Sequence, residues 1–270
     1  MTLKPLIAGA AALLPLFAAA EAAAVRFDVI PPDASELAAN DDGSTGAVEI
    51  GFTVNFFGSV NDTLFVNNNG NVTFDGALSQ FTPDDLTATA TNIIAPFFAD
   101  VDTRGTGSVT YGQTSVDGRA AFVVTWDSVG YFSRQTDRTN TFQLVLIDRS
   151  DTGAGNFDIE FNYDQIQFET GEASDGAGGL GGNSARVGYS NGTGAAGTFF
   201  ELAGSAQNGA FLDGSDSGLA LIENMLNSDV AGRYVFEARN GIVTAAVPVP
   251  GAVVFLVTGL VGGLAARRRA

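Results

Sequence analysis

Carboxylates are the side chains of this sequence best suited to chemistry, because its 270 residues include no histidine and no cysteine. Asp100 and Asp102 follow an apolar run, and on a strand two residues with this spacing point to the same face. Two carboxylates together with loop carbonyl groups are a suitable start for a calcium site, since Ca²⁺ binds oxygen ligands. Asp100 and Asp102 are therefore candidate calcium ligands, with Asp75, Asp84 and Asp85 expected nearby.

A structural role for the same two aspartates is the interpretation we prefer. The run does not fit the EF-hand template, because Arg104 stands at a ligand position and Tyr111 replaces the bidentate glutamate. Arg104 paired with one of the aspartates would complete a structural network instead. The segments "DDGSTG" (41–46) and "DGSDSG" (213–218) are typical of turns first and of ion sites second. Apart from calcium, no cofactor is expected.

The composition excludes several classes of function. Without histidine or cysteine, the chain has no imidazole or thiolate to act as nucleophile, base or zinc ligand. A pair of carboxylates could hydrolyse glycosides, but no pair is set apart among the 30 acidic residues. We therefore predict that the protein is not an enzyme. Its net charge of −17 repels phosphate backbones, so nucleic acid is not an expected partner.

The middle of the chain has the pattern of β-strands. Apolar and polar residues alternate over 48–56, which describes a strand with one face in a core and the other in water. Asn69-Gly70 and Asp117-Gly118 each separate two apolar runs and predict hairpins. Together these features predict an all-β fold, an antiparallel β-sandwich. The Gly-rich segment 169–183 is expected to be a mobile surface loop.

The N-terminus has the three parts of a secretory signal peptide. Lys4 precedes an apolar stretch over 6–20, and small residues follow at 22–24. We therefore place a signal peptide at residues 1–24 and the folded domain at 25–240. The short segment 241–246 would link this domain to the C-terminal segment.

The C-terminal segment 247–270 combines prolines, an apolar run and a charged end. The run 251–266 can span a thinned bilayer as a transmembrane helix. Three arginines after it hold that end on the cytoplasmic side: Arg267, Arg268 and Arg269. Four residues before it form an extended stretch that a processing enzyme can hold: Val247, Pro248, Val249 and Pro250. An ordinary membrane anchor is the alternative interpretation.

This tail resembles the PEP-CTERM class of bacterial sorting signals, which have a Val-Pro-x-Pro motif, a Gly-containing apolar helix and a terminal Arg cluster. Val249 stands where glutamate is usual and is closer to the VPLPA-CTERM variant, although Gly251 replaces the alanine of that variant. The resemblance implies recognition by an exosortase-type membrane protease, removal of the tail, and release or attachment at the surface of a Gram-negative-type cell. The protein would be anchored in the inner membrane only transiently.

The body of the chain carries a second resemblance. Its residues from about 45 to 220 resemble, in order, the nidogen-like (NIDO) extracellular domain, and Phe168 stands where that family commonly has tryptophan. The motifs that carry the resemblance are "IIAPFFADVDTRGTGSVTY" (93–111), "VTWDSVGYF" (124–132), "NTFQLVLIDR" (140–149), "FDIEFNYDQIQFETG" (157–171) and "ARVGYSNGTG" (185–194). The resemblance implies an extracellular module of matrix and surface proteins with no known catalytic centre.

Taken together, these features predict an exported protein of the cell surface or extracellular matrix, with an adhesive or structural role in biofilm or exopolysaccharide. Its expected partners are an exosortase-type protease and extracellular polysaccharide or surface proteins. An alternative from a different class is a secreted carbohydrate-binding or carbohydrate-hydrolysing protein.

Overall fold

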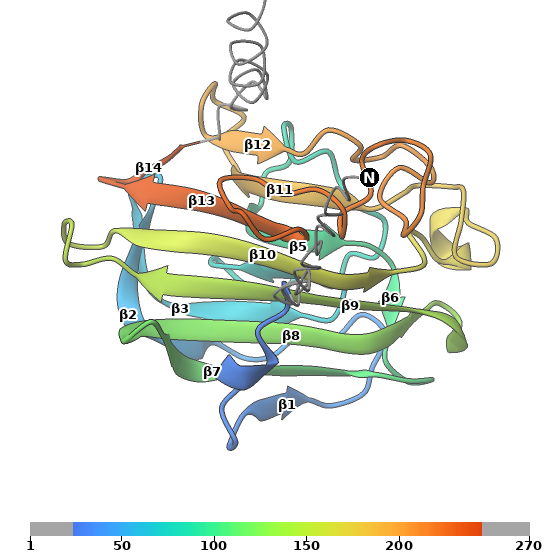
Figure 1. Ribbon diagram of the computed structural model, residues 1–270, viewed down its shortest axis with the longest axis horizontal. Coiled ribbons are helices and arrows are strands. Elements are labelled where there is room, and N and C mark those ends of the chain that lie inside the picture. The colour runs from blue at the N-terminus through green and yellow to red at the C-terminus, as the bar shows by residue number, and fades with distance from the viewer. Residues whose placement is uncertain (1–23, 245–270) are drawn as a thin grey trace, which may run out of the picture.

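The fold is built from two antiparallel β-sheets packed as a sandwich (Figure 1). The computed structural model describes residues 24–244. The larger sheet has the order β1 (Ser35–Leu37), β7 (Ser108–Val116), β8 (Arg119–Tyr131), β9 (Gln135–Asp148), β10 (Phe157–Ile166), β13 (Arg233–Arg239) and β14 (Ile242–Thr244), with β6 (Val101–Asp102) paired to β8. The smaller sheet has the order β12 (Phe199–Glu201), β11 (Arg186–Asn191), β5 (Asn92–Phe98), β4 (Asn71–Thr73), β3 (Ser59–Asn67) and β2 (Val48–Phe56).

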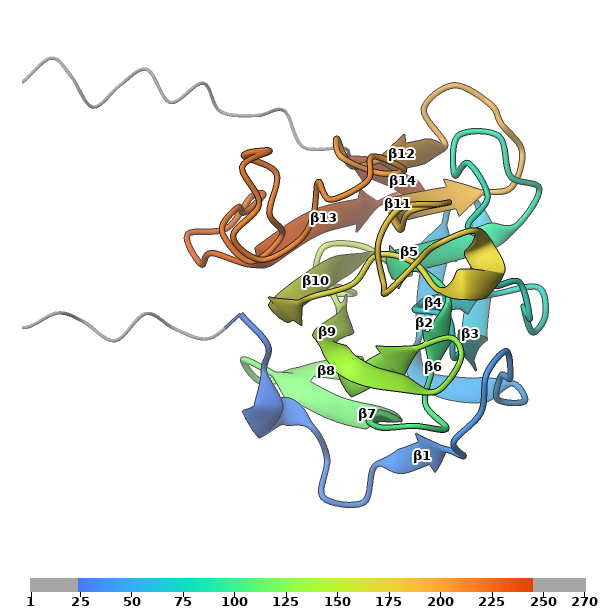
Figure 2. The ribbon, with the colours of Figure 1, turned by 90° about the vertical axis from the view of Figure 1, so that its right-hand side faces the viewer.

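The prediction of an all-β sandwich is confirmed. Figure 2 shows the two layers edge-on. The chain begins in the larger sheet, crosses to the smaller one for β2 to β5, returns for β6 to β10, crosses again for β11 and β12, and ends in the larger sheet. Within 24–244 the helices are two 3₁₀ turns, η1 (Phe27–Val29) and η2 (Glu172–Ser174).

The predicted export signals fall almost entirely outside the described residues. This applies to the signal peptide at 1–24, apart from Ala24, and to the whole segment 247–270 with its proposed transmembrane helix. Among residues 24–244, no helix has the length and apolar character that crossing a membrane requires. Part of the predicted linker 241–246 belongs to the fold, because β14 pairs with β13 through residues 242–244.

Two hairpins form where the Asn-Gly and Asp-Gly pairs predict them. In the β7–β8 turn, Asp117 and Gly118 have φ values of +50° and +76°, as the twist of a two-residue hairpin requires. In the β3–β4 turn, Gly70 has φ +76°. Gly70 also packs against β5, since a Cβ at this position would overlap the carbonyl oxygen of Phe97. The β3–β4 turn is therefore held closely against the neighbouring strand.

The core lies between the sheets and is rich in aromatic side chains. Along β2 the predicted alternation is present, because Ile50, Val54 and Phe56 are fully buried between more exposed neighbours. Trp126 of β8 stacks on Phe142 of β9 with ring centroids 5.0 Å apart. Large apolar side chains buried in this way each contribute about 2–3 kcal/mol to folding. This packing holds the two sheets together, and the loops project from their ends.

The segment 169–183 is anchored in the fold, which makes the prediction of a mobile loop wrong. Glu169 is fully buried, and its carboxylate accepts the backbone N–H groups of Gly209 at 2.5 Å and Phe211 at 2.7 Å. The backbone N–H of Glu169 donates to Gly179 O at 2.9 Å and closes the segment on itself. The anchor is a buried carboxylate bound to backbone donors, so the apolar pattern of the sequence does not reveal it.

Candidate functional site

Three carboxylates converge at one end of the sandwich and form a cluster that we call the acidic corner: Asp41, Asp42 and Asp100. The first two lie in the loop between β1 and β2, and the third directly precedes β6. One carboxylate oxygen from each residue lies within 4.8 Å of the corresponding oxygens of the other two. Strand β6 lies at the end of the sandwich that faces the viewer in Figure 2.

The β3–β4 turn holds the two halves of the acidic corner together. The side-chain amide of Asn68 donates to Asp41 O at 2.5 Å and to Val101 O at 2.6 Å. The side-chain amide of Asn69 donates to Asp42 Oδ1 at 2.9 Å, and its oxygen accepts the Val101 N–H at 2.9 Å. Both asparagines are buried. Because one turn binds both the acidic loop and β6, the carboxylates are held at a defined spacing.

The carboxylate of Asp100 is buried without a hydrogen-bond partner. The residue is 1% exposed, and neither Oδ1 nor Oδ2 has a partner among the described residues. Gly171 covers this carboxylate closely, since a Cβ there would overlap Asp100 Oδ2. Asp41 Oδ1 is likewise buried and unpartnered. Such oxygens are uncommon in folded proteins, because the desolvation of a charged group is then left without compensation.

Asp102 has the opposite environment. Its Oδ1 accepts the backbone N–H and the Nε–H of Arg104, both at 2.9 Å. Its Oδ2 accepts Arg104 Nη2 at 2.6 Å and the backbone N–H of Arg134 at 2.8 Å. The pairing of Arg104 with one of the two aspartates is therefore as expected from the sequence. Arg104 Nη2 also lies 2.9 Å from Asp41 Oδ2, which links Asp102 to the acidic corner.

The pKa values of the carboxylates follow from these different environments. Burial, followed by the negative charges of Asp41, Asp42 and Asp102, raises the pKa of Asp100 to about 7. Burial and the charge of Asp102 raise the pKa of Asp41 to about 6, although Arg104 opposes the shift. For Asp102, burial is outweighed by the donated hydrogen bonds, and its pKa is lowered. The acidic corner thus gathers negative charge without matching donors, an arrangement that a hard cation can neutralise.

The fold brings together a different set of carboxylates from the one expected. Asp100 lies with Asp41 and Asp42, whereas Asp102 is engaged by Arg104. The other aspartates expected nearby are not among the clustered carboxylates of the described residues: Asp75, Asp84 and Asp85. The adjacent acidic pair in "DDGSTG" is the feature of the sequence that could have indicated Asp41 and Asp42 as ligands. It could not be joined to Asp100 from the sequence, because the sheet order is what places them side by side.

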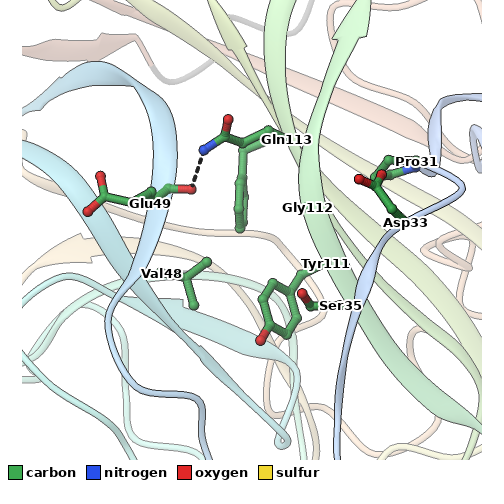
Figure 3. A pocket seen from close by; sticks show the side chains of 9 residues that line it. Pro31, Asp33, Ser35, Val48, Glu49, Tyr111, Gly112 and Gln113 are labelled. Atoms are coloured by element: carbon green, nitrogen blue, oxygen red, sulfur yellow. Dashed lines mark hydrogen bonds between the residues drawn. The ribbon is translucent and has the colours of Figure 1, made fainter.

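An open pocket of about 330 Å³ lies beside β7. Tyr111 and Gln113 line it, and the Gln113 side-chain amide donates to Glu49 O at 3.1 Å (Figure 3). Figure 3 shows Asp33 and Glu49 on opposite sides of the pocket, with Tyr111 between them. An aromatic ring beside polar groups can bind an amphipathic ligand such as a sugar. The two carboxylates are separated across the pocket rather than paired.

The part of the chain that forms most of β3 and the strands up to β13 matches the model of a known family. The family model of the nidogen-like domain (NIDO) matches residues 62–240. The chain belongs to the nidogen-like domain family. The resemblance carried by the motifs over about 45–220 is thereby confirmed.

Curated relatives of this nidogen-like domain are much longer proteins. The chain is 35% identical over 222 residues to alpha-tectorin of Mus musculus and 34% identical to that of Homo sapiens, in each case over 73% of this chain and 10% of the relative. It is 28% identical over 151 residues to nidogen of Drosophila melanogaster, over 42% of this chain and 11% of that relative. The chain thus spans about a tenth of the length of these relatives. No solved structure matches it.

The acidic corner straddles the boundary of the family match. Asp100 lies inside the matched residues 62–240 of the nidogen-like domain. Asp41 and Asp42 precede them and come from the loop that enters the smaller sheet. Two of the three carboxylates are therefore contributed by a segment outside the matched part of the domain.

Proposed function

We propose that this nidogen-like domain is an exported, non-catalytic module of the cell surface or extracellular matrix, with an adhesive or structural role in biofilm or exopolysaccharide. The observation that carries the proposal is the family match over residues 62–240. Membership supports it because the resemblance implies an extracellular module of matrix and surface proteins.

The proposal includes processing at both ends of the chain. The signal peptide 1–24 would be removed on export, and an exosortase-type protease would recognise Val247 to Pro250 and remove the tail. The arginines at 267–269 would keep the end of the tail at the cytoplasmic face until cleavage. The last described strand, β14, ends at Thr244, and in the sequence only Ala245 and Ala246 stand between it and the motif.

Cell fractionation tests this route. The full chain and a variant lacking residues 247–270 are expressed in a bacterial host that has the sorting protease, and each fraction is probed for the protein. We expect the full chain to leave the cytoplasm and lose its tail, and the truncated form to be exported without being sorted. If both forms remain in the cytoplasm, the proposal is wrong.

Point variants separate sorting from export. Pro248→Ala combined with Pro250→Ala should leave the tail uncut, because the extended conformation of the motif is lost. The matched control is Val249→Leu, which brings the motif closer to the VPLPA-CTERM variant and should be cut normally. Normal cutting of the double proline variant would contradict recognition of this motif.

The pocket beside β7 favours a second candidate function, carbohydrate binding. Retention of the protein on the polysaccharide of its host would support this function, and Tyr111→Ala should reduce retention about tenfold by removing the ring. The control Tyr111→Phe keeps the ring and should bind almost normally. Cleavage of the polysaccharide by the wild-type protein would contradict the non-catalytic role.

A further inference from the structure

We propose that the acidic corner is a calcium site, in which Asp41, Asp42 and Asp100 each supply carboxylate oxygen to one Ca²⁺ ion. The proposal does not rest on export or on sorting of the chain. It would hold for the folded domain in any compartment that contains enough calcium.

The buried carboxylate of Asp100 is the first step of the argument. It is 1% exposed, it has no donor for either oxygen, and it lies against two further carboxylates. Elsewhere in the described chain, buried carboxylates are matched by donors, as Asp102 and Glu169 are. An uncompensated carboxylate among like charges requires either a proton or a cation. A cation also neutralises the neighbouring carboxylates, which a single proton does not.

The spacing of the cluster is the second step. Calcium binds oxygen at about 2.4 Å, so two ligands on opposite sides of the ion are about 4.8 Å apart. The three carboxylate oxygens lie within 4.8 Å of one another, so they fit around one ion of this size. Magnesium requires a near-ideal octahedron at about 2.1 Å and gives up its water reluctantly, so it is less suited than calcium to a site with three protein carboxylates. The remaining positions of a six- to eight-coordinate calcium ion can be filled by water and backbone carbonyl groups.

The way in which the neighbouring groups are engaged is the third step. Arg104 occupies both oxygens of Asp102 and Oδ2 of Asp41, but Asp41 Oδ1 remains unpartnered in the described structure. The side-chain amide of Asn69 binds Oδ1 of Asp42 and orients that carboxylate. The donors present therefore hold the ligands in position without neutralising Asp100. A bound ion would tie the β1–β2 loop to β6.

Calcium binding to the full-length chain in mild detergent tests the inference, after the protein has been stripped with a chelator. Titration calorimetry with calcium chloride should show one site with Kd of about 10⁻⁴ to 10⁻³ M, as in extracellular modules. About 10 mM calcium should raise the melting temperature by roughly 5 °C, while the same concentration of magnesium should change it much less.

Two variants decide whether this effect belongs to the acidic corner. Asp100→Asn should weaken calcium binding at least about tenfold and remove the thermal shift. Asp42→Asn should weaken binding as well, and it changes a less buried residue, so the test does not depend on one variant. The matched control Asp84→Asn removes the same charge from an exposed aspartate outside the cluster and should behave as wild type.

Three results would overturn the inference. They are the absence of calcium binding by the wild-type protein, an unchanged calcium response in Asp100→Asn, and an equal thermal shift with magnesium. Each is separable from the export proposal, which is tested by the location of the protein in the cell.

Discussion

Asp100 and Asp102 lie on either side of Val101, and their carboxylates have opposite environments. Asp102 accepts hydrogen bonds from the Arg104 guanidinium and from two backbone N–H groups, whereas Asp100 accepts none in the described structure. Both residues are almost completely buried. The difference arises because Arg104 folds back onto Asp102 while Asp100 faces the β1–β2 loop. One carboxylate is thus part of the framework, and the other is available for a ligand.

Asp100→Asn should stabilise the calcium-free protein. The change replaces an uncompensated charged group with a neutral amide that can donate to Asp41, so the free energy of unfolding should rise by about 1–3 kcal/mol. Urea unfolding at pH 8 in the presence of chelator measures it. A decrease in stability under these conditions would show that Asp100 is compensated in the calcium-free protein.

Asp102→Ala should have the opposite effect. It leaves the backbone N–H groups of Arg104 and Arg134 without their acceptor, so the free energy of unfolding should fall by about 3 kcal/mol or more. The control Asp84→Ala alters an exposed side chain and should change stability by less than about 0.5 kcal/mol. Similar unfolding midpoints for the two variants would contradict a structural role for Asp102.

Gly70→Ala and Gly118→Ala form a matched pair, because both glycines have φ +76°. A Cβ at Gly118 meets no atom within 4 Å. The free energy of unfolding of Gly118→Ala should therefore fall by only about 1 kcal/mol, which is the cost of placing alanine in a left-handed conformation. At Gly70 the Cβ would also overlap Phe97 O, so the loss should be larger by at least about 2 kcal/mol. Thermal unfolding compares them. Equal losses would contradict the close approach of the β3–β4 turn to β5.

Asp213 predicts a pH dependence of stability. Burial raises its pKa to about 6 from an ordinary value of 3.8, although the Ile166 N–H opposes the shift. The folded state therefore holds this proton more tightly than the unfolded state, and the contribution of Asp213 to stability falls as the pH rises from about 4 to about 6. The free energy of unfolding of Asp213→Asn should exceed that of the wild type by about 1–3 kcal/mol at pH 7 and equal it at pH 4. The same difference at both pH values would exclude Asp213 as its source.

Much of the fold follows from local chemistry that a sequence displays. The alternation over 48–56 is that of a strand buried on one face, and the Asp117-Gly118 pair favours positive φ wherever it occurs. Such features depend on neighbours within a few residues. The order of strands in the two sheets depends instead on contacts between segments that are far apart in the chain.

The acidic corner could be predicted only in part for the same reason. Asp100 was a candidate ligand, but its partners come from a loop that precedes a different sheet. The asparagines of the β3–β4 turn predict a hairpin, and their sequence does not reveal that Asn68 and Asn69 bind the acidic loop. Glu169 is a similar case, because a buried carboxylate that binds backbone donors has no periodic pattern.

Export and trimming of this nidogen-like domain are tested most directly by the intact mass of the protein recovered from outside its host cells. We expect one species that has lost the residues up to about 24 and the arginines at 267–269, and that retains the whole domain 25–240. A protein found in the cytoplasm with Met1 and Arg269 both present would contradict the account.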